Sequence, residues 1–298
     1  MTNHSLSYII STKNRLKYLK ILFERLLPQL EPGEEIVVVD SNSSDGSKEY
    51  LQELYSSGKI HQFISEADKN QAHGWNKALL MANGTIIKKL IDDDVPDFKA
   101  IRTCRDFMLR NPEIDICISD MMTADVLNPA QVGLSGRLSY FKEWKAGHNK
   151  TFTFSDVSML QRRSSLSFIG LYDTQFKMLD WEYSLRATYL GAKIAYYTGY
   201  NALSVDTPGN VTSTATPELK KLEESIGRVK YEYAGDESDI SLYSKIKVWI
   251  GETRDELKKS VAKGPLPQLS ETQLREIYAS YYRKLEEKNA AAKGQFIF

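Results

Sequence analysis

The chain has 298 residues, 42% of them hydrophobic and 26% charged, which is typical of a soluble globular protein with a substantial core. Its formal net charge is zero, so bulk electrostatics gives no case for binding nucleic acid or an anionic membrane. The two cysteines, Cys104 and Cys117, form no CxxC pair, and we expect small buried thiols in a reducing compartment.

The N-terminal stretch MTNHSLSYIISTKNR lacks a basic segment followed by a long apolar core, so no signal peptide is predicted. No apolar run approaches the roughly 18 residues that a transmembrane helix needs. We therefore expect a cytoplasmic protein and leave open its peripheral attachment to the inner face of a membrane.

Strands and helices alternate through the first 120 residues. Short apolar runs predict strands at 6–12, 35–40, 60–64, 85–91 and 114–119. Amphipathic spacing predicts helices between them at about 16–27, 47–55, 75–82 and 100–110. The run EIVVVD at 35–40 is typical of a parallel strand covered on both faces. This order predicts a doubly wound α/β fold.

The second half is less regular. Residues 125–150 show no clear pattern, which favours a substrate loop. Strands are predicted at 155–161 and 192–197, with a helix at 180–190 between them. Amphipathic stretches at about 217–233, 239–261 and 270–287 predict a helical extension. We therefore divide the chain into a catalytic domain, 1–213, and an extension, 214–298.

Two interpretations of the extension remain. The one we favour is that its apolar stripes cover the catalytic domain. In the other, its lysines and aromatic residues rest on a membrane that holds a lipid-linked acceptor.

Three consecutive acids, Asp92, Asp93 and Asp94, follow the predicted strand at 85–91. They should open into the crevice beyond the carboxyl ends of the strands. Burying three carboxylates is costly unless a cation lies among them, and Mg²⁺ or Mn²⁺ often binds one or two carboxylates plus substrate phosphates. Strand alternation directs Asp92 and Asp94 to one side and Asp93 to the other. The alternative is a solvated acidic turn.

Three other polar residues are candidates for the same crevice. Asp40 ends the strand at 35–40, where it could bind a base N–H or a ribose hydroxyl, or cap the turn SNSSDG. Asp180 begins a predicted helix and is either an N-cap or a general base. His73 lies in the loop before the helix at 75–82 and is a candidate ligand contact.

Several common motifs are missing. The chain contains no GxSxG, no GxGxxG and no GxxxxGK[ST] sequence. These absences argue against serine-hydrolase, Rossmann dinucleotide and P-loop chemistry.

Four blocks occur in an ordered series: SYIISTKNRLKYLKILFERLLPQ, EIVVVDSNSSDGSKEYL, SEADKNQAHGWNKALLMANGTIIKKLIDDD and MLDWEYSLRATYLGAKIAYY. Together they resemble the family 2 glycosyltransferases and cover about 1–120 and 155–200. The resemblance implies a GT-A fold, with a mostly parallel central sheet flanked by helices. It also implies inverting transfer of a sugar from a nucleotide-sugar, with UDP as the expected nucleotide. A carbohydrate or lipid-linked glycan would be the acceptor, in bacterial surface polysaccharide synthesis, with Mn²⁺ or Mg²⁺ as cofactor.

By position, the resemblance implies that Asp40 binds uracil, with Thr12 and Arg15 close to the nucleotide. Asp92 would contact ribose or metal-bound water, with Asp93 beside it at the nucleotide, and Asp94 would ligate the cation. Asp180 matches the general base that deprotonates the acceptor hydroxyl.

The chain departs from the family pattern at three places. Leu179 stands where the family has the first acid of an acidic pair. His73 replaces an aspartate of the loop that touches the nucleotide. Asp206 lies in the region where the family often has a histidine as a further metal ligand, and it is our third metal candidate.

Rival interpretations remain. A sugar-phosphate nucleotidyltransferase should carry a glycine-rich basic loop after the first strand, and STKNRLKYL has no glycine. A haloacid-type phosphatase needs DxDx[TV], which DSNSS does not match. A non-catalytic sugar-nucleotide-binding or scaffold protein is the third alternative. The sequence names neither the sugar, the acceptor nor the oligomeric state.

Overall fold

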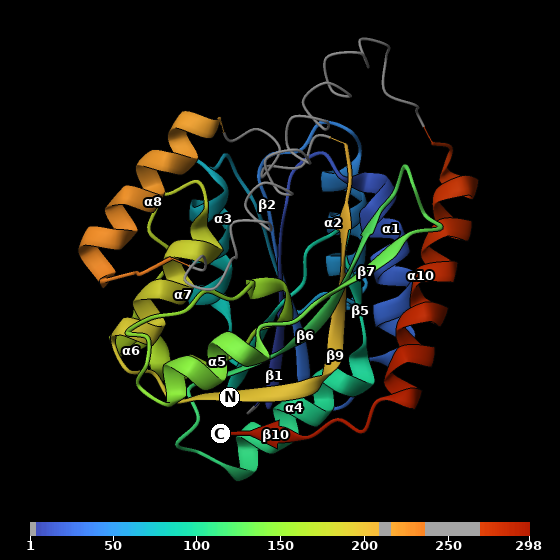
Figure 1. The fold of residues 1–298 in the computed structure, drawn as a ribbon. Coiled ribbons are helices and arrows are strands. Elements are labelled where there is room, and N and C mark those ends of the chain that lie inside the picture. Colours follow the sequence, from blue (N-terminus) through green and yellow to red (C-terminus); the bar gives the residue numbers. More distant parts are fainter. Residues whose placement is uncertain (1–3, 209–215, 236–268) are drawn as a thin grey trace, which may run out of the picture.

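The structure is a computed structural model that describes residues 4–208, 216–235 and 269–298. Within these residues a ten-stranded sheet has the order β10-β9-β6-β8-β4-β1-β2-β3, with β5 paired to β9 and β7 paired to β6 (Figure 1). The strands are β1 Leu6–Thr12, β2 Glu34–Asp40, β3 Gln62–Ser65, β4 Ile86–Lys89, β5 Val95–Pro96, β6 Ile116–Asp125, β7 Val132–Ser135, β8 Leu160–Arg162, β9 Ile194–Asp206 and β10 Phe296–Ile297.

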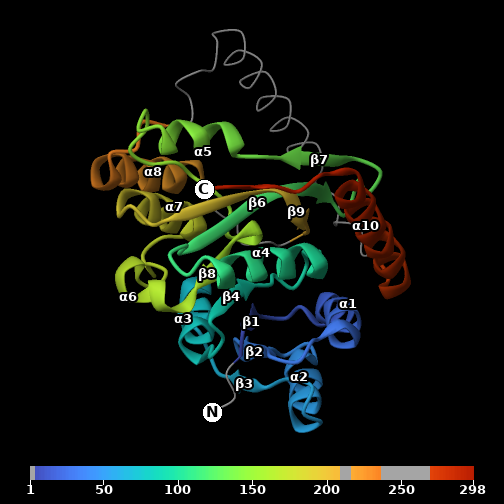
Figure 2. The same cartoon turned by 90° about the horizontal axis from the view of Figure 1, so that it is seen from below.

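Helices cover both faces of this sheet. The α-helices are α1 Leu16–Leu26, α2 Ser47–Ser56, α3 Gln71–Met81, α4 Phe98–Arg110, α5 Leu138–Lys145, α6 Leu166–Ile169, α7 Leu179–Tyr189, α8 Pro217–Tyr231 and α10 Glu271–Ala291. Short 3₁₀ turns occupy Leu27–Gln29, Asp156–Ser158 and Arg163–Ser165. Viewed end-on, β1, β2 and β3 lie between α3 on one side and α1 and α2 on the other (Figure 2).

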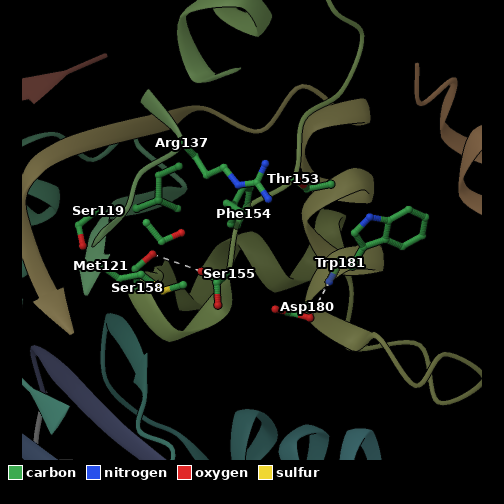
Figure 3. A pocket seen from close by; sticks show the side chains of 11 residues that line it. Ser119, Met121, Arg137, Thr153, Phe154, Ser155, Ser158, Asp180 and Trp181 are labelled. Carbon is green, nitrogen blue, oxygen red and sulfur yellow. Dashed lines mark hydrogen bonds between the residues drawn. The ribbon is translucent and has the colours of Figure 1, made fainter. Parts of the chain in front are cut away.

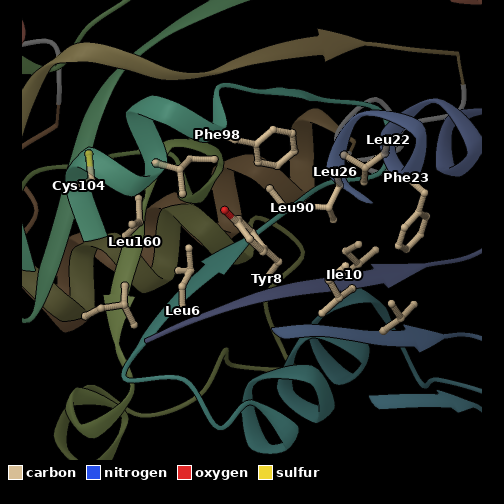
Figure 4. Packing of buried hydrophobic residues seen from close by; sticks show 14 of the residues in the cluster. Leu6, Tyr8, Ile10, Leu22, Phe23, Leu26, Leu90, Phe98, Cys104 and Leu160 are labelled. Carbon is tan, nitrogen blue, oxygen red and sulfur yellow. The ribbon is translucent and has the colours of Figure 1, made fainter. Parts of the chain in front are cut away.

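The alternating faces of the strands explain this layering. On β1, Leu6, Tyr8 and Ile10 face the cluster formed with α1 and α4, whereas Ile9 belongs to the cluster on the α3 and α7 side. Figure 4 shows the first cluster, in which the β1 side chains meet Phe98 from α4. Because both faces are apolar, β1 and β2 are buried along nearly their whole length.

Strand directions set the position of the crevice. The pairs β1–β2, β1–β4, β2–β3 and β6–β9 are parallel, whereas β8 is antiparallel to both β4 and β6. The carboxyl ends of β1, β2 and β4 therefore meet at one edge of the sheet. The predicted α/β fold is confirmed, and its sheet is mixed: β3, β2, β1 and β4 are parallel neighbours, whereas β5, β7, β8 and β10 pair antiparallel.

Several segments differ from the sequence prediction; among them, the strand predicted at 192–197 is β9, which runs from Ile194 to Asp206. Residues 125–150, predicted to be irregular, contain β7 and α5, since β7 pairs with the extended β6. The predicted strand at 155–161 is mostly a 3₁₀ turn followed by the short β8. Helix α3 begins at Gln71 and not at the predicted residue 75, because the Asn70 side chain accepts the His73 N–H at 3.0 Å and caps the helix.

The described C-terminal elements pack on the rest of the chain. Helix α8 contacts α7, whereas α10 contacts β9, β5 and α1, and β10 joins the sheet antiparallel to β9. The predicted stretch at 239–261 lies outside the described residues, and the boundary at 213/214 stays a prediction. No helix in the described ranges is both long and apolar enough to cross a bilayer.

Candidate active site

A cavity of about 650 Å³ lies at the carboxyl ends of β1, β2 and β4. Thr12 ends β1, Ser41 follows β2, and Asp92–Asp94 follow β4 by a short extended link. The opposite side is formed by residues 155–157 and by the start of α7. Its size falls within the range of about 300–1,000 Å³ that is common for ligand sites.

Arg15 organises the first wall of this cavity. Its Nε donates to Asp92 Oδ1 at 3.2 Å, and its terminal nitrogen donates to Asp93 and, at 2.8 Å, to Thr207 Oγ1. Thr12 Oγ1 donates to the other oxygen of Asp92 at 2.6 Å. Burial and the neighbouring Asp93 charge nevertheless raise the pKa of Asp92 to about 6. Two adjacent carboxylates are thus held in place by one guanidinium.

Asp94 differs from its two neighbours. Its Oδ1 accepts the Val205 N–H at 2.8 Å, but its buried Oδ2 has no hydrogen-bond partner within the described residues. Burial, and then the charge of Asp93, raise the pKa of Asp94 well above its usual range. An unsatisfied buried carboxylate oxygen is costly and calls for an external partner.

These carboxylates fit a hard divalent cation. Asp94 offers an unpartnered oxygen, and Asp92 lines the same cavity. In the described part of the chain no group of three His, Cys, Asp or Glu side chains converges as a complete metal site. That is compatible with Mg²⁺ or Mn²⁺, which often take only one or two protein carboxylates and complete their coordination with phosphates and water. All three acids line the cavity, including Asp93, whose carboxylate contacts Arg15 and Thr207.

Asp180 also lines this cavity, from the first turn of α7. Its Oδ1 accepts the Trp181 N–H at 2.9 Å. Burial raises the pKa of Asp180 to about 6, and the charge of Asp156 adds to this while Lys89 opposes it. A carboxylate with this pKa is mostly ionised at pH 7 and is a better proton acceptor than an exposed aspartate.

Sequence reasoning missed a buried ion pair beside Asp180. Lys89 and Asp156, both about 95% buried, form a salt bridge on the cavity wall. The Lys89 ammonium lies 4.2 Å from the Trp75 ring centroid, and the Tyr172 hydroxyl donates to Asp156 at 2.9 Å. The sequence signal that could have indicated this ion pair is the two lysines inside the apolar run TIIKKLI, because a buried lysine requires a partner for its charge. The sequence did not indicate which acid it would be.

Lys88, the other lysine of this run, points to the opposite face. Its ammonium donates to the backbone carbonyl of Val157, and burial lowers its pKa to about 8. It thereby ties β4 to the turn that carries Asp156.

Three predicted site residues do not line the cavity. Asp40 is fully buried and accepts from the Ser65 hydroxyl at 2.6 Å and from the Ser43 N–H at 3.0 Å, so it caps its own turn. His73 Nδ1 accepts the Lys69 N–H at 3.2 Å, outside the lining. Asp206 is exposed at the end of β9, whereas its neighbours Ser204 and Val205 do line the cavity. The nucleotide and metal roles of these three residues stay predictions.

A second, smaller pocket of about 140 Å³ adjoins the first (Figure 3). Asp180, Ser155 and Trp181 line both spaces, so the Asp180 carboxylate stands at the boundary between them. The remaining lining residues of the small pocket are Ile118, Ser119, Met121, Ser135, Arg137, Thr153, Phe154 and Ser158. A carboxylate between a large and a small pocket is in reach of ligands in both.

Solved structures with a similar fold are glycosyltransferases. Residues 1–349 of TarS from S. aureus, in complex with UDP-GlcNAc, superpose with a TM-score of 0.56 at 17% identity, covering 95% of this chain and 90% of that one. The mannosyltransferase PcManGT from Pyrobaculum calidifontis, in complex with GDP-Man and Mn²⁺, gives 0.53 at 14% identity, with 98% and 88% covered. Glucosyl-3-phosphoglycerate synthase from Mycobacterium tuberculosis gives 0.51 at 12%, with 78% and 82% covered. These likenesses show the GT-A fold.

Two sequence comparisons bear on the family. The chain is 33% identical over 92 residues to an uncharacterized glycosyltransferase of Nostoc sp., a match that covers 30% of this chain and only 28% of that relative. The family model described as "Glycosyl transferase family 2" matches residues 7–170. Because this match spans more than half of the 298 residues, the chain belongs to glycosyl transferase family 2.

Proposed function

We propose that the protein is an inverting glycosyltransferase that moves a sugar from a nucleotide-sugar, with UDP as the favoured nucleotide, to an acceptor hydroxyl. The observation that carries this proposal is the position of Asp180, which lines the large cavity together with Asp92–Asp94 and also lines the small pocket. The complexes of similar structures with UDP-GlcNAc and with GDP-Man and Mn²⁺ support a nucleotide-sugar donor in the large cavity.

Asp94 and Asp92 are the residues that would hold Mn²⁺ or Mg²⁺. When bound, the cation would neutralise negative charge on the diphosphate leaving group. Arg15 and Thr12 hold Asp92 in a fixed orientation by hydrogen bonds to its two oxygens. The site is therefore largely preorganised for a charged donor.

Asp180 acts as the general base. It accepts the proton of the acceptor hydroxyl while that oxygen forms a bond to the anomeric carbon of the donor. The bond from that carbon to the phosphate oxygen breaks, and its electron pair leaves with the nucleoside diphosphate. A single displacement of this kind inverts the configuration at the anomeric carbon.

The decisive variant is Asp180→Asn. We expect kcat to fall by about 10²–10⁴, because the amide cannot accept the proton, while UDP affinity stays unchanged. UDP release from a panel of UDP-sugars measures kcat, and titration calorimetry with UDP, with and without Mn²⁺, measures binding. Asp106→Asn, on the exposed side of α4, is the matched control and should behave as wild type.

The turnover and binding measurements would contradict different parts of the proposal. Near wild-type turnover in Asp180→Asn would show that another group is the base. Absence of Mn²⁺-dependent UDP binding by the wild-type chain would instead remove the donor assignment.

A further inference from the structure

The small pocket has room for one sugar ring. Its volume of about 140 Å³ corresponds to about ten water positions. It is enclosed by β6, by the segment between β7 and α5, by residues 153–158, and by the start of α7. Because Asp180 lies at its boundary with the donor cavity, a hydroxyl bound in it can reach the base.

The pocket lining combines three kinds of group. Flat apolar surface comes from Phe154 and Trp181, which suits the faces of a sugar ring. Hydroxyl groups come from Ser119, Ser135, Thr153, Ser155 and Ser158. Among the lining residues Arg137 is the only cation and Asp180 the only acid. Figure 3 shows these two charged side chains on different walls of the same pocket.

Residues of the sheet hold the backbone of Arg137 in place. Its N–H donates to the Tyr196 hydroxyl at 2.8 Å, and Tyr196 in turn donates to Asp120. A Cβ at the preceding Gly136 would overlap the Asp120 carboxylate, so a larger residue there would have to displace this acceptor of the Tyr196 hydroxyl. Arg137 is the N-cap residue of α5, whose Phe141 is fully buried. The backbone that carries the Arg137 side chain is therefore fixed, and its guanidinium lies 5.1 Å from the Tyr140 ring centroid.

A guanidinium has a planar fork of donors that matches the two oxygens of a carboxylate or phosphate. The lining hydroxyls are sufficient for the neutral hydroxyls of a sugar, but they do not complement an anion. We infer that the small pocket binds the acceptor, and that this acceptor carries an oxyanion, as in a uronic acid or a sugar phosphate, recognised by Arg137. This inference rests on the proposed transferase function.

Titration calorimetry tests it on the full chain saturated with UDP and Mn²⁺. The probes are glucose, glucuronate and glucose 6-phosphate. We expect at least one anionic sugar to bind about tenfold more tightly than glucose, and the better of the two identifies a carboxylate or a phosphate as the recognised group. In Arg137→Gln that advantage should disappear while UDP affinity is unchanged. Arg163→Gln, an exposed arginine outside the pocket, should keep it.

Three results would overturn the inference: equal affinity of the wild type for glucose and both anions, no measurable binding of any of the three at about 10 mM, or an equal loss in the Arg163 control. The sugar titrations are repeated without nucleotide. If UDP does not bind at all, the proposed function fails, whereas the comparison of anionic and neutral sugars still tests the pocket.

Discussion

At the scale of single residues, the site keeps buried carboxylates that are unfavourable for stability. The pKa of Asp92 and that of Asp180 are both raised to about 6, chiefly by burial, and burial also raises the pKa of Asp94 well above its usual range. For such groups the folded state prefers the protonated form. Their contribution to stability is therefore present at low pH and is lost as pH rises through the folded-state pKa.

The Asp180 pKa predicts the acid limb of the activity profile. Because the base must be ionised, kcat should rise between about pH 5 and pH 7 with an apparent midpoint near 6. Initial rates of UDP release across this range measure the midpoint. An activity that is independent of pH in this range would contradict the assignment.

The variant Asp94→Asn tests whether the Asp94 carboxylate lowers the stability of the metal-free protein and is needed to bind the cation. Removing a buried charge with an unsatisfied oxygen should raise the melting temperature of the metal-free protein at pH 7.5 by about 2 °C or more. The same variant should lose the extra stabilisation that Mn²⁺ plus UDP gives the wild type. Differential scanning calorimetry with EDTA, or with both ligands, separates the two effects. A lower melting temperature in EDTA would mean that the charge is satisfied in the folded protein.

At the scale of elements, α8 fixes the start of the helix that carries Asp180. The Glu223 side chain of α8, only 3% exposed, accepts the N–H groups of Lys177 at 2.7 Å and Met178 at 2.9 Å. A second contact follows one turn into α7, where the Tyr231 hydroxyl donates to the buried Glu182. Leu179 occupies the position where the family resemblance expects an acid, and Glu223 brings a carboxylate to this same end of α7 from a distant part of the chain.

Glu223→Gln should therefore reduce kcat about tenfold. Hydrogen bonds to a charged acceptor contribute about 1.5–3 kcal/mol, so their weakening should loosen residues 177–178 and, with them, the position of Asp180. The affinity for UDP should not change. Glu224→Gln is the matched control, because Glu224 forms an exposed pair with Arg228 on the same helix. The split between kcat and UDP affinity distinguishes positioning of the base from general destabilisation. Unaltered kcat in Glu223→Gln would exclude this role.

At the scale of the whole molecule, α10 is part of the folded body around the site. Leu274, Tyr278 and Tyr281 of this helix are buried in a cluster with Val95 and Leu203 of the sheet. The Tyr278 hydroxyl donates to the Asp93 backbone carbonyl at 2.6 Å, within the acidic turn itself. The C-terminal helix therefore supports the acidic turn that lines the large cavity.

Removal of residues 269–298 should expose this cluster and strip β10 from the edge of the sheet. We expect a drop in the unfolding free energy of several kcal/mol, because fully burying each large side chain contributes about 1.5–3 kcal/mol. Urea unfolding followed by circular dichroism measures it. A truncated chain with unchanged stability would show that α10 is a separate accessory element.

Local patterns were sufficient to predict the alternation of strands and helices and the position of the acidic turn. Asp92–Asp94 could be placed at the crevice because parallel strands bring their carboxyl ends to one edge. The resemblance to family 2 glycosyltransferases, and not strand geometry, implied that Thr12, Arg15 and Asp180 lie at the same site, and all of these residues line one cavity. The sequence left open that Asp40 caps its own turn, as its bond from Ser43 now shows, but it did not predict the second bond, from Ser65. Those bonds depend on how the turn after β2 folds against β3.

The tertiary structure alone decided which distant groups meet. The pairing of Lys89 with Asp156, the capping of residues 177–178 by Glu223, and the contact of Tyr278 with the acidic turn join segments 45–185 residues apart. Periodicity reports only which face of an element is buried, not which element covers it. Hydrophobic burial is non-directional, so the choice among partners came from packing and from the need to satisfy each buried polar group.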